Sequence, residues 1–129
     1  MRTLALGLAL AILLAPAARA QTEGLTVGYM LPICEVFLGL RHGDTQTQWE
    51  AALCAGTALG VAQVMSLNCS SREAEGMSPH PDLSAAMPPN RAAGVQAWIN
   101  WARANPEEWN TNFEASFINA YAEAFPCPN

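Results

Sequence analysis

Trp49 to Cys69, WEAALCAGTALGVAQVMSLNC, is an apolar stretch that carries two of the four cysteines and, after Glu50, no charged residue. Ala52, Gly56 and Gly60 recur every four residues, so on a helix they share one face. A glycine inside a helix costs about 1 kcal/mol relative to alanine, which indicates that these small residues have a use. The pattern predicts a central helix whose glycine ridge allows close backbone approach of a neighbouring helix.

Two other interpretations of this stretch stay open. It can be an ordinary core helix with incidental glycines, or it can be a membrane span. A span needs about 18 to 25 apolar residues, whereas Ala51 to Leu67 is shorter and contains Gln63. In the central-helix interpretation, apolar side chains beside the ridge supply burial, namely Leu53, Leu59, Val64 and Leu67.

The first twenty residues have the three parts of a secretory signal peptide. Met1-Arg2 is a positive start, Leu4 to Leu14 is apolar, and Ala18-Arg19-Ala20 fits the cleavage site. We therefore expect residues 1–20 to be removed and residues 21–129 to form a single exported domain.

The composition is acidic, with 6 arginines and no lysine against 11 aspartates and glutamates. Nucleic acid is not expected as a partner, because phosphate binding needs a basic patch. An anionic membrane surface is disfavoured for the same reason. A cationic protein partner would be attracted by the negative charge of the chain.

Four cysteines in a small exported chain predict two disulfides. Their spacing lacks the paired C-x-x-C of zinc sites, so no metal is expected. Two helices joined by a short turn near Asp44 should be antiparallel, and Cys34 and Cys54 lie equally far from that turn. We therefore predict Cys34–Cys54, which leaves Cys69 to pair with Cys127.

Helical periodicity and capping residues place three more helices around the central one. The first begins at Pro32 or, with Pro32 as a kink, within residues 25–31, and ends at His42-Gly43. Thr45 or Thr47 caps the central helix, with Thr47 and Glu50 forming a capping box. The third helix covers residues 91–104 behind Asn90, and the fourth starts at Asn105-Pro106 and ends near Ala124. No segment alternates like a strand, so the expected fold is an all-α, four-helix, disulfide-stapled domain.

Residues 70–89 differ from the rest in holding four prolines and several charges. Such long loops in compact domains are usually functional or disordered, and a partner-binding loop and a flexible connection both stay open. The candidate partner contacts are the acidic residues Glu73, Glu75 and Asp82. Residues 83–87 are candidates for one helical turn docked on the body.

The sequence contains no G-x-S-x-G, phosphate-binding loop or H-E-x-x-H motif. Both histidines fall in turn or loop contexts, and the disulfides leave no thiol for catalysis. We expect no catalytic residue and no cofactor, and hence a binding protein rather than an enzyme.

Two groups of short motifs resemble one family. Leu53-Cys54-Ala55-Gly56 with Gly60-Val61 is similar to its C-x-G core, and Asn105-Pro106-Glu107 with Ala124-Phe125-Pro126-Cys127 is similar to its N-P-E … A-F-P-C ending. This family is the Rap/Tai immunity proteins of type VI secretion. The resemblance implies a periplasmic protein, usually a homodimer, that binds and blocks a peptidoglycan amidase effector. The chain departs from the family at Thr57, where an aromatic residue is usual, and in residues 70–87, which look like an insertion.

A second hypothesis comes from another class of protein. Small exported helical proteins with disulfides also include the HdeA-type acid-stress chaperones. Loss of carboxylate charge at low pH could loosen a dimer and expose apolar helix faces that hold client proteins.

Overall fold

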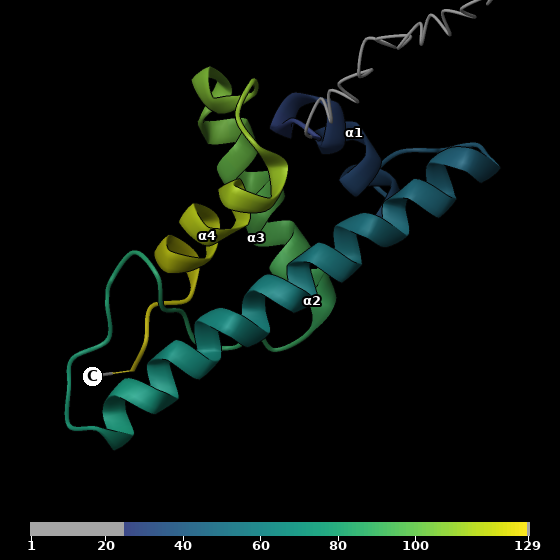
Figure 1. The fold of residues 1–129 in the computed structure, drawn as a ribbon. Helices are drawn as coiled ribbons and strands as arrows, with labels where there is room; N and C mark the ends of the chain where they lie inside the picture. Colours follow the sequence, from purple (N-terminus) through teal and green to yellow (C-terminus); the bar gives the residue numbers. More distant parts are fainter. Residues whose placement is uncertain (1–24, 129) are drawn as a thin grey trace, which may run out of the picture.

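The computed structural model describes residues 25–128, which form four α-helices (Figure 1). They are α1 (Val27–Phe37), α2 (Thr45–Ala74), α3 (Arg91–Ala104) and α4 (Phe113–Ala124), with a short 3₁₀ helix η1 (Pro106–Glu108) before α4. The predicted small all-α, four-helix fold is confirmed. Within the described residues, the only β-type pairing is an isolated bridge between Thr26 and Asn112. The predicted signal peptide, residues 1–20, lies outside this part of the chain.

The first helix begins upstream of its proline. Thr26 caps α1 by accepting a hydrogen bond from the Tyr29 backbone N–H at 3.3 Å, and Pro32 lies inside the helix. The upstream start that the sequence left open is therefore the one observed. α1 ends at Phe37, before the predicted end at His42, because Gly39 adopts a φ of 70° and turns the chain.

Asp44 caps α2, not Thr45 or Thr47 as predicted. Its carboxylate accepts from the Thr47 backbone N–H at 2.8 Å and from the Thr47 hydroxyl at 2.7 Å. These bonds hold the pKa of Asp44 below its usual value, the backbone bond most strongly. A carboxylate that accepts two hydrogen bonds, and whose charge is favourable at a helix N-terminus, is a better cap than a lone hydroxyl. The Thr47–Glu50 capping box is absent because Thr47 lies inside the helix, and Glu50 accepts from the Gln46 side chain.

The predicted packing of the glycine ridge inside the chain is wrong. Gly56 and Gly60 are exposed, and a Cβ placed at either would meet no atom within 4 Å. Close packing is achieved instead by alanines on the opposite face, which bring α2 near its neighbours without the helix cost of glycine. These residues are Ala51, Ala55, Ala58 and Ala62. The side chains expected to be buried beside the ridge are exposed by 38% to 67%, namely Leu53, Leu59, Val64 and Leu67.

The two predicted disulfides are both present. Cys34 on α1 bonds to Cys54 on α2, with Cα atoms 5.5 Å apart, which confirms the side-by-side pairing of the two helices. Cys69, near the end of α2, bonds to Cys127 with Cα atoms 5.8 Å apart. The second bond therefore ties the C-terminal end of the chain to the far end of the longest helix.

The third helix matches its prediction. Asn90 caps α3 by accepting from the Ala93 N–H at 2.8 Å. Four residues at helical spacing form its inner face and are all fully buried, namely Val95, Trp98, Ile99 and Ala102.

The fourth helix starts later than predicted. Asn105-Pro106 opens only the 3₁₀ turn η1, and the chain then breaks before Asn112 caps α4. The break has a physical reason, because residues 109–113 pair with the start of α1 instead of with their own helix. The Gly28 N–H donates to the Trp109 carbonyl at 2.8 Å, and the Phe113 N–H donates to the Leu25 carbonyl at 2.8 Å.

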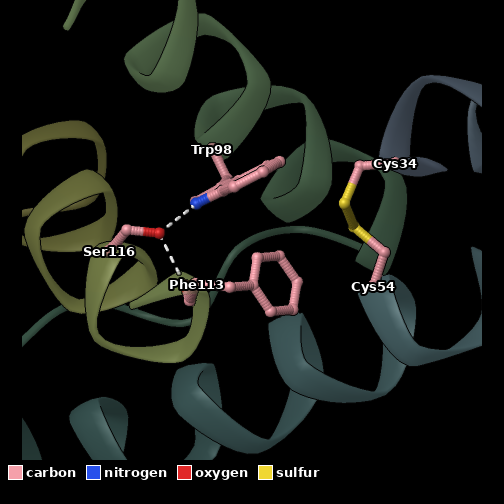
Figure 2. Close-up of a disulfide and its surroundings, with 5 residues drawn as sticks. All are labelled: Cys34, Cys54, Trp98, Phe113 and Ser116. Atoms are coloured by element: carbon pink, nitrogen blue, oxygen red, sulfur yellow. Dashed lines mark hydrogen bonds between the residues drawn. A yellow bond between two sulfur atoms is a disulfide. The ribbon is translucent and has the colours of Figure 1, made fainter. Parts of the chain in front are cut away.

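An aromatic cluster forms the centre of the core beside the Cys34–Cys54 bond (Figure 2). Trp98 stacks on Phe117, with ring centroids 5.1 Å apart, and meets Phe113 edge-on at 5.1 Å. The Trp98 indole N–H donates to the buried Ser116 hydroxyl at 2.6 Å, and that hydroxyl donates to the Phe113 carbonyl. The Trp98 indole N–H and the Ser116 hydroxyl are therefore both hydrogen-bonded, although both lie in the core.

Glu35 connects α1 to the following turn and to α3. Its carboxylate accepts from Arg41 at 3.0 Å and from Arg103 at 2.8 Å, and Glu35 is only 8% exposed. Burial raises the pKa of Glu35, but the hydrogen bonds and charges of Arg103 and Arg41 outweigh burial and hold the pKa below its usual value.

Candidate partner-binding surface

The segment between α2 and α3 begins with a sharp reversal. α2 continues through Ala74, so the first five residues of the predicted loop are helical. Gly76 then adopts a φ of 69°, and the Met77 N–H donates to the Arg72 carbonyl at 2.8 Å. Glycine reaches this left-handed conformation without strain and commonly ends helices in this way. The chain therefore turns back beside the last turns of α2.

The end of the same segment is attached to the body of the protein. The Ala85 N–H donates to the Met65 carbonyl of α2 at 3.3 Å, and the Ala86 N–H donates to the Phe125 carbonyl at 2.6 Å. Residues 83–87 are thus docked as predicted, but residues 84–88 are not helical. Their backbone groups bond to α2 and to the C-terminal segment instead of to one another.

A cleft of about 560 Å³ lies between this segment, the end of α2 and the C-terminal residues. Figure 1 shows the loop passing beside the C-terminal end of the chain. The Cys69–Cys127 bond holds the two sides together. The cleft is lined by Cys69, Ser70, Glu73, Met77, Ser78, Pro79, His80, Pro81, Ser84, Ala122, Pro126, Cys127 and Pro128.

Five of the lining residues have polar side chains, and two of them, Ser84 and His80, differ in their bonding. The Ser84 hydroxyl is buried and has no hydrogen-bond partner within residues 25–128. The His80 Nδ1 accepts from the Asp82 backbone N–H at 3.3 Å. Catalysis by a hydroxyl needs a base within hydrogen-bond reach of it, and Ser84 makes no such contact in the described chain. The arrangement suits recognition of a partner segment by a few polar groups between proline walls.

The three predicted acidic contacts do not form one cluster. Glu73 lines the cleft, whereas Glu75, at the end of α2, and Asp82, in the turn at residues 81–83, lie outside its lining. All three are exposed, and none forms an ion pair with another described residue. Their charges are therefore available to a cationic partner.

The C-terminal wall of the cleft was missed by sequence reasoning. Pro126 and Pro128 line the cleft together with the loop prolines Pro79 and Pro81. Proline fixes its backbone and has no N–H to pair, so four prolines in two segments give rigid walls. The predicted Cys69–Cys127 disulfide could have indicated this wall, because it places residues 126–128 beside the end of α2 and the loop that follows.

Comparisons with known proteins bring no match: no family model, curated protein or solved structure corresponds to this chain. The structure itself supports a small all-α fold with two disulfides. Disulfides form and persist in oxidising compartments. The bonds therefore indicate an environment outside the cytoplasm.

Proposed function

We propose that the protein is a periplasmic immunity protein that binds and blocks a peptidoglycan amidase effector of type VI secretion. The observation that carries the proposal is the position of the motifs that resemble the Rap/Tai family. Cys54 of the first motif forms a disulfide with Cys34 of α1, and Cys127 of the second motif forms a disulfide with Cys69 of α2. Both motifs therefore hold the helices together, as residues shared by a family with one fold are expected to do. Because a fold alone does not define a function, the function is tested directly below.

Inhibition in this proposal is stoichiometric and needs no chemistry from the protein. The segment 75–90 and the cleft beside it would occupy the active-site groove of the amidase. Glu73, Glu75 and Asp82 would meet cationic groups around that groove, since complementary charges speed association and select partners. Docking at both ends of the segment limits the entropy lost on binding.

The test is inhibition of a purified candidate amidase, chosen as a small Cys/His hydrolase encoded beside this protein. We expect a stable complex and loss of hydrolase activity at one equivalent. Replacing the three carboxylates together (Glu73→Gln, Glu75→Gln, Asp82→Asn) should weaken inhibition at least about tenfold. The matched control neutralises three carboxylates elsewhere (Glu107→Gln, Glu108→Gln, Glu123→Gln) and should inhibit normally. Absence of binding to any such hydrolase would remove the proposal.

Export to the periplasm belongs to the same proposal. The disulfides agree with it, and residues 1–20 supply the signal. We expect the mature protein in the periplasmic fraction to begin at Gln21, as checked by N-terminal sequencing. A cytoplasmic protein that retains Met1 would contradict this part.

An acid-stress chaperone is the second candidate, and the Glu35 site favours it. Protonation of Glu35 would weaken its two ion pairs, which connect α1 to the turn and to α3. Acid would thus loosen contacts between helices and expose apolar surface. Light scattering of a client protein at low pH tests this role, and unchanged client aggregation in the presence of the protein would exclude it.

A further inference from the structure

The longest helix is apolar on two opposite faces. One face of α2 is buried against the rest of the chain, including Ala58 and Met65. The opposite face exposes 76% of Trp49, 51% of Leu53 and 67% of Leu67. A helix that is apolar all round is normally covered on every side. Within residues 25–128, nothing covers this second face.

The exposed residues form a straight line along the helix. They follow one another at steps of four and three, which keeps residues on one side of a helix. We call this line the outer stripe, and it consists of Trp49, Leu53, Gly56, Gly60, Gln63 and Leu67. Val64, which is 62% exposed, lies next to it. From Ala51 to Ser71 the helix has no charged residue, which is typical of the core of an interface.

The order of residues in the outer stripe reads similarly in both directions. Its middle is at position 58, with Gly56 and Gly60 on either side, Leu53 opposite Gln63, and the large residues Trp49 and Leu67 at the ends. A surface with this property is complementary to itself when turned by a two-fold axis. Two copies crossing there would meet at their glycines, where backbones can approach closely. Large side chains would fill the space where the crossed helices diverge.

We propose that a second copy of this chain covers the outer stripe, with the two α2 helices antiparallel about a two-fold axis. Gly56 then lies beside the partner's Gly60, and Trp49 packs against the partner's Leu67. The inference does not rest on the immunity function, because the stripe and the loop cleft involve different residues.

The available area is adequate for such a dimer. From their exposed fractions, Trp49, Leu53, Val64 and Leu67 expose roughly 500 Å² per copy, so two copies supply roughly 1,000 Å² before backbone is counted. Stable interfaces bury about 1,200 to 2,000 Å² and transient ones less, so this area suits a reversible dimer. The absence of charge on this part of α2 also matters, because the chain has a net charge of −5 and its other surfaces would repel a second copy.

A lipid bilayer is the rival occupant. α2 has the length and hydropathy of a membrane span, and a third of its most apolar window is buried inside the protein. A spanning helix must be surrounded by lipid or protein at every depth. Disulfides at Cys54 and Cys69 join α2 to the polar remainder of the chain, which would have to enter the bilayer with it.

Sedimentation of the mature chain tests the proposal. We expect a reversible dimer, weakened at least about tenfold by Gly56→Leu, because a large side chain separates the helices at their crossing. The variant should fold as well as the parent, since a Cβ at position 56 has open space. Ala115→Leu adds the same side chain at an exposed position of α4 and should leave the dimer unchanged.

A pair of charged variants tests the register. Trp49→Glu alone should be monomeric, and mixing it with Leu67→Arg should restore a mixed dimer in which the new charges meet. A monomeric parent chain, an undiminished Gly56→Leu dimer or a failed mixture would each overturn the proposal. A monomer that binds vesicles of phosphatidylcholine and phosphatidylglycerol would assign the stripe to the bilayer.

Discussion

Gly94 and Tyr121 set the separation of α3 and α4. The Tyr121 hydroxyl donates to the Ala58 carbonyl of α2 at 3.2 Å, and the Tyr121 ring meets Phe117 and Phe125 edge-on. A Cβ at position 94 would overlap the Tyr121 hydroxyl and lie 3.2 Å from its Cζ. Burial also raises the pKa of Tyr121, so the phenol stays neutral and keeps its donor role. The Tyr121 side chain of α4 therefore bonds to α2 and fits against α3 only because residue 94 has no side chain.

We predict that Gly94→Ala lowers stability by about 1 to 3 kcal/mol, because the fixed ring cannot retreat. Urea unfolding measures the change. Gly60→Ala is the control, and at concentrations where the chain is monomeric it should gain up to about 1 kcal/mol. Equal effects of the two substitutions would contradict the packing described for Gly94.

The Glu35 site makes stability depend on pH. Its lowered pKa means that the ion pairs contribute fully above the unfolded-state value of about 4.3 and are lost as pH falls through the folded-state pKa. Glu35→Gln should cost about 1 to 2 kcal/mol at pH 7, a modest value because both arginines are half exposed. The difference from the parent chain should persist down to about pH 5 and shrink below about pH 4. A difference that stays constant to pH 2 in urea unfolding would assign the loss to packing.

At the scale of helices, local signals predicted some elements and not others. α3 could be predicted fully, because Asn90 and a buried face at helical spacing agree. The break before α4 could not, since Asn105-Pro106 is a good local start and the competing bonds come from residues 25–28, far away in sequence. The loop site was indicated only by composition, and its C-terminal wall is brought to it by the Cys69–Cys127 bond, which joins residues 58 positions apart. The exposure of Gly56 and Gly60 could not be predicted, because small residues spaced by four look the same in sequence on a buried and on an exposed helix face.

The late start of α4 makes Asn112 important. Its side chain accepts from the Ala115 N–H at 2.8 Å and caps the helix. We predict that Asn112→Ala costs about 1 kcal/mol. Asn105→Ala should cost less, because Asn105 makes no cap bond to η1 and its amide only donates to the Trp101 carbonyl at the end of α3, at 2.8 Å. Thermal unfolding of the two variants measures the difference. A loss for Asn112→Ala no larger than that for Asn105→Ala would contradict the role of Asn112 as the cap of α4.

At the scale of the whole molecule, the two disulfides have different tasks. Cys34–Cys54 closes 20 residues and both its cysteines are fully buried, so it belongs to the core. Cys69–Cys127 spans 58 residues and joins the end of α2 to the chain beyond α4. It therefore holds the two walls of the loop cleft together, and the Ala86–Phe125 hydrogen bond depends on the same alignment.

This division of tasks predicts different consequences when each bond is removed. Loop entropy alone assigns about 3 kcal/mol to the shorter bond and about 4 kcal/mol to the longer one, so either pair of Cys→Ala substitutions should lower the urea midpoint. Native-state proteolysis should separate them. Without Cys69–Cys127, cleavage within residues 75–87 should rise strongly, because the C-terminal wall no longer holds the loop. Without Cys34–Cys54, the loop should keep its protection until the whole domain unfolds. Mass spectrometry of the first fragments decides, and equal early cleavage of the loop in both variants would show that the cleft does not depend on its own disulfide.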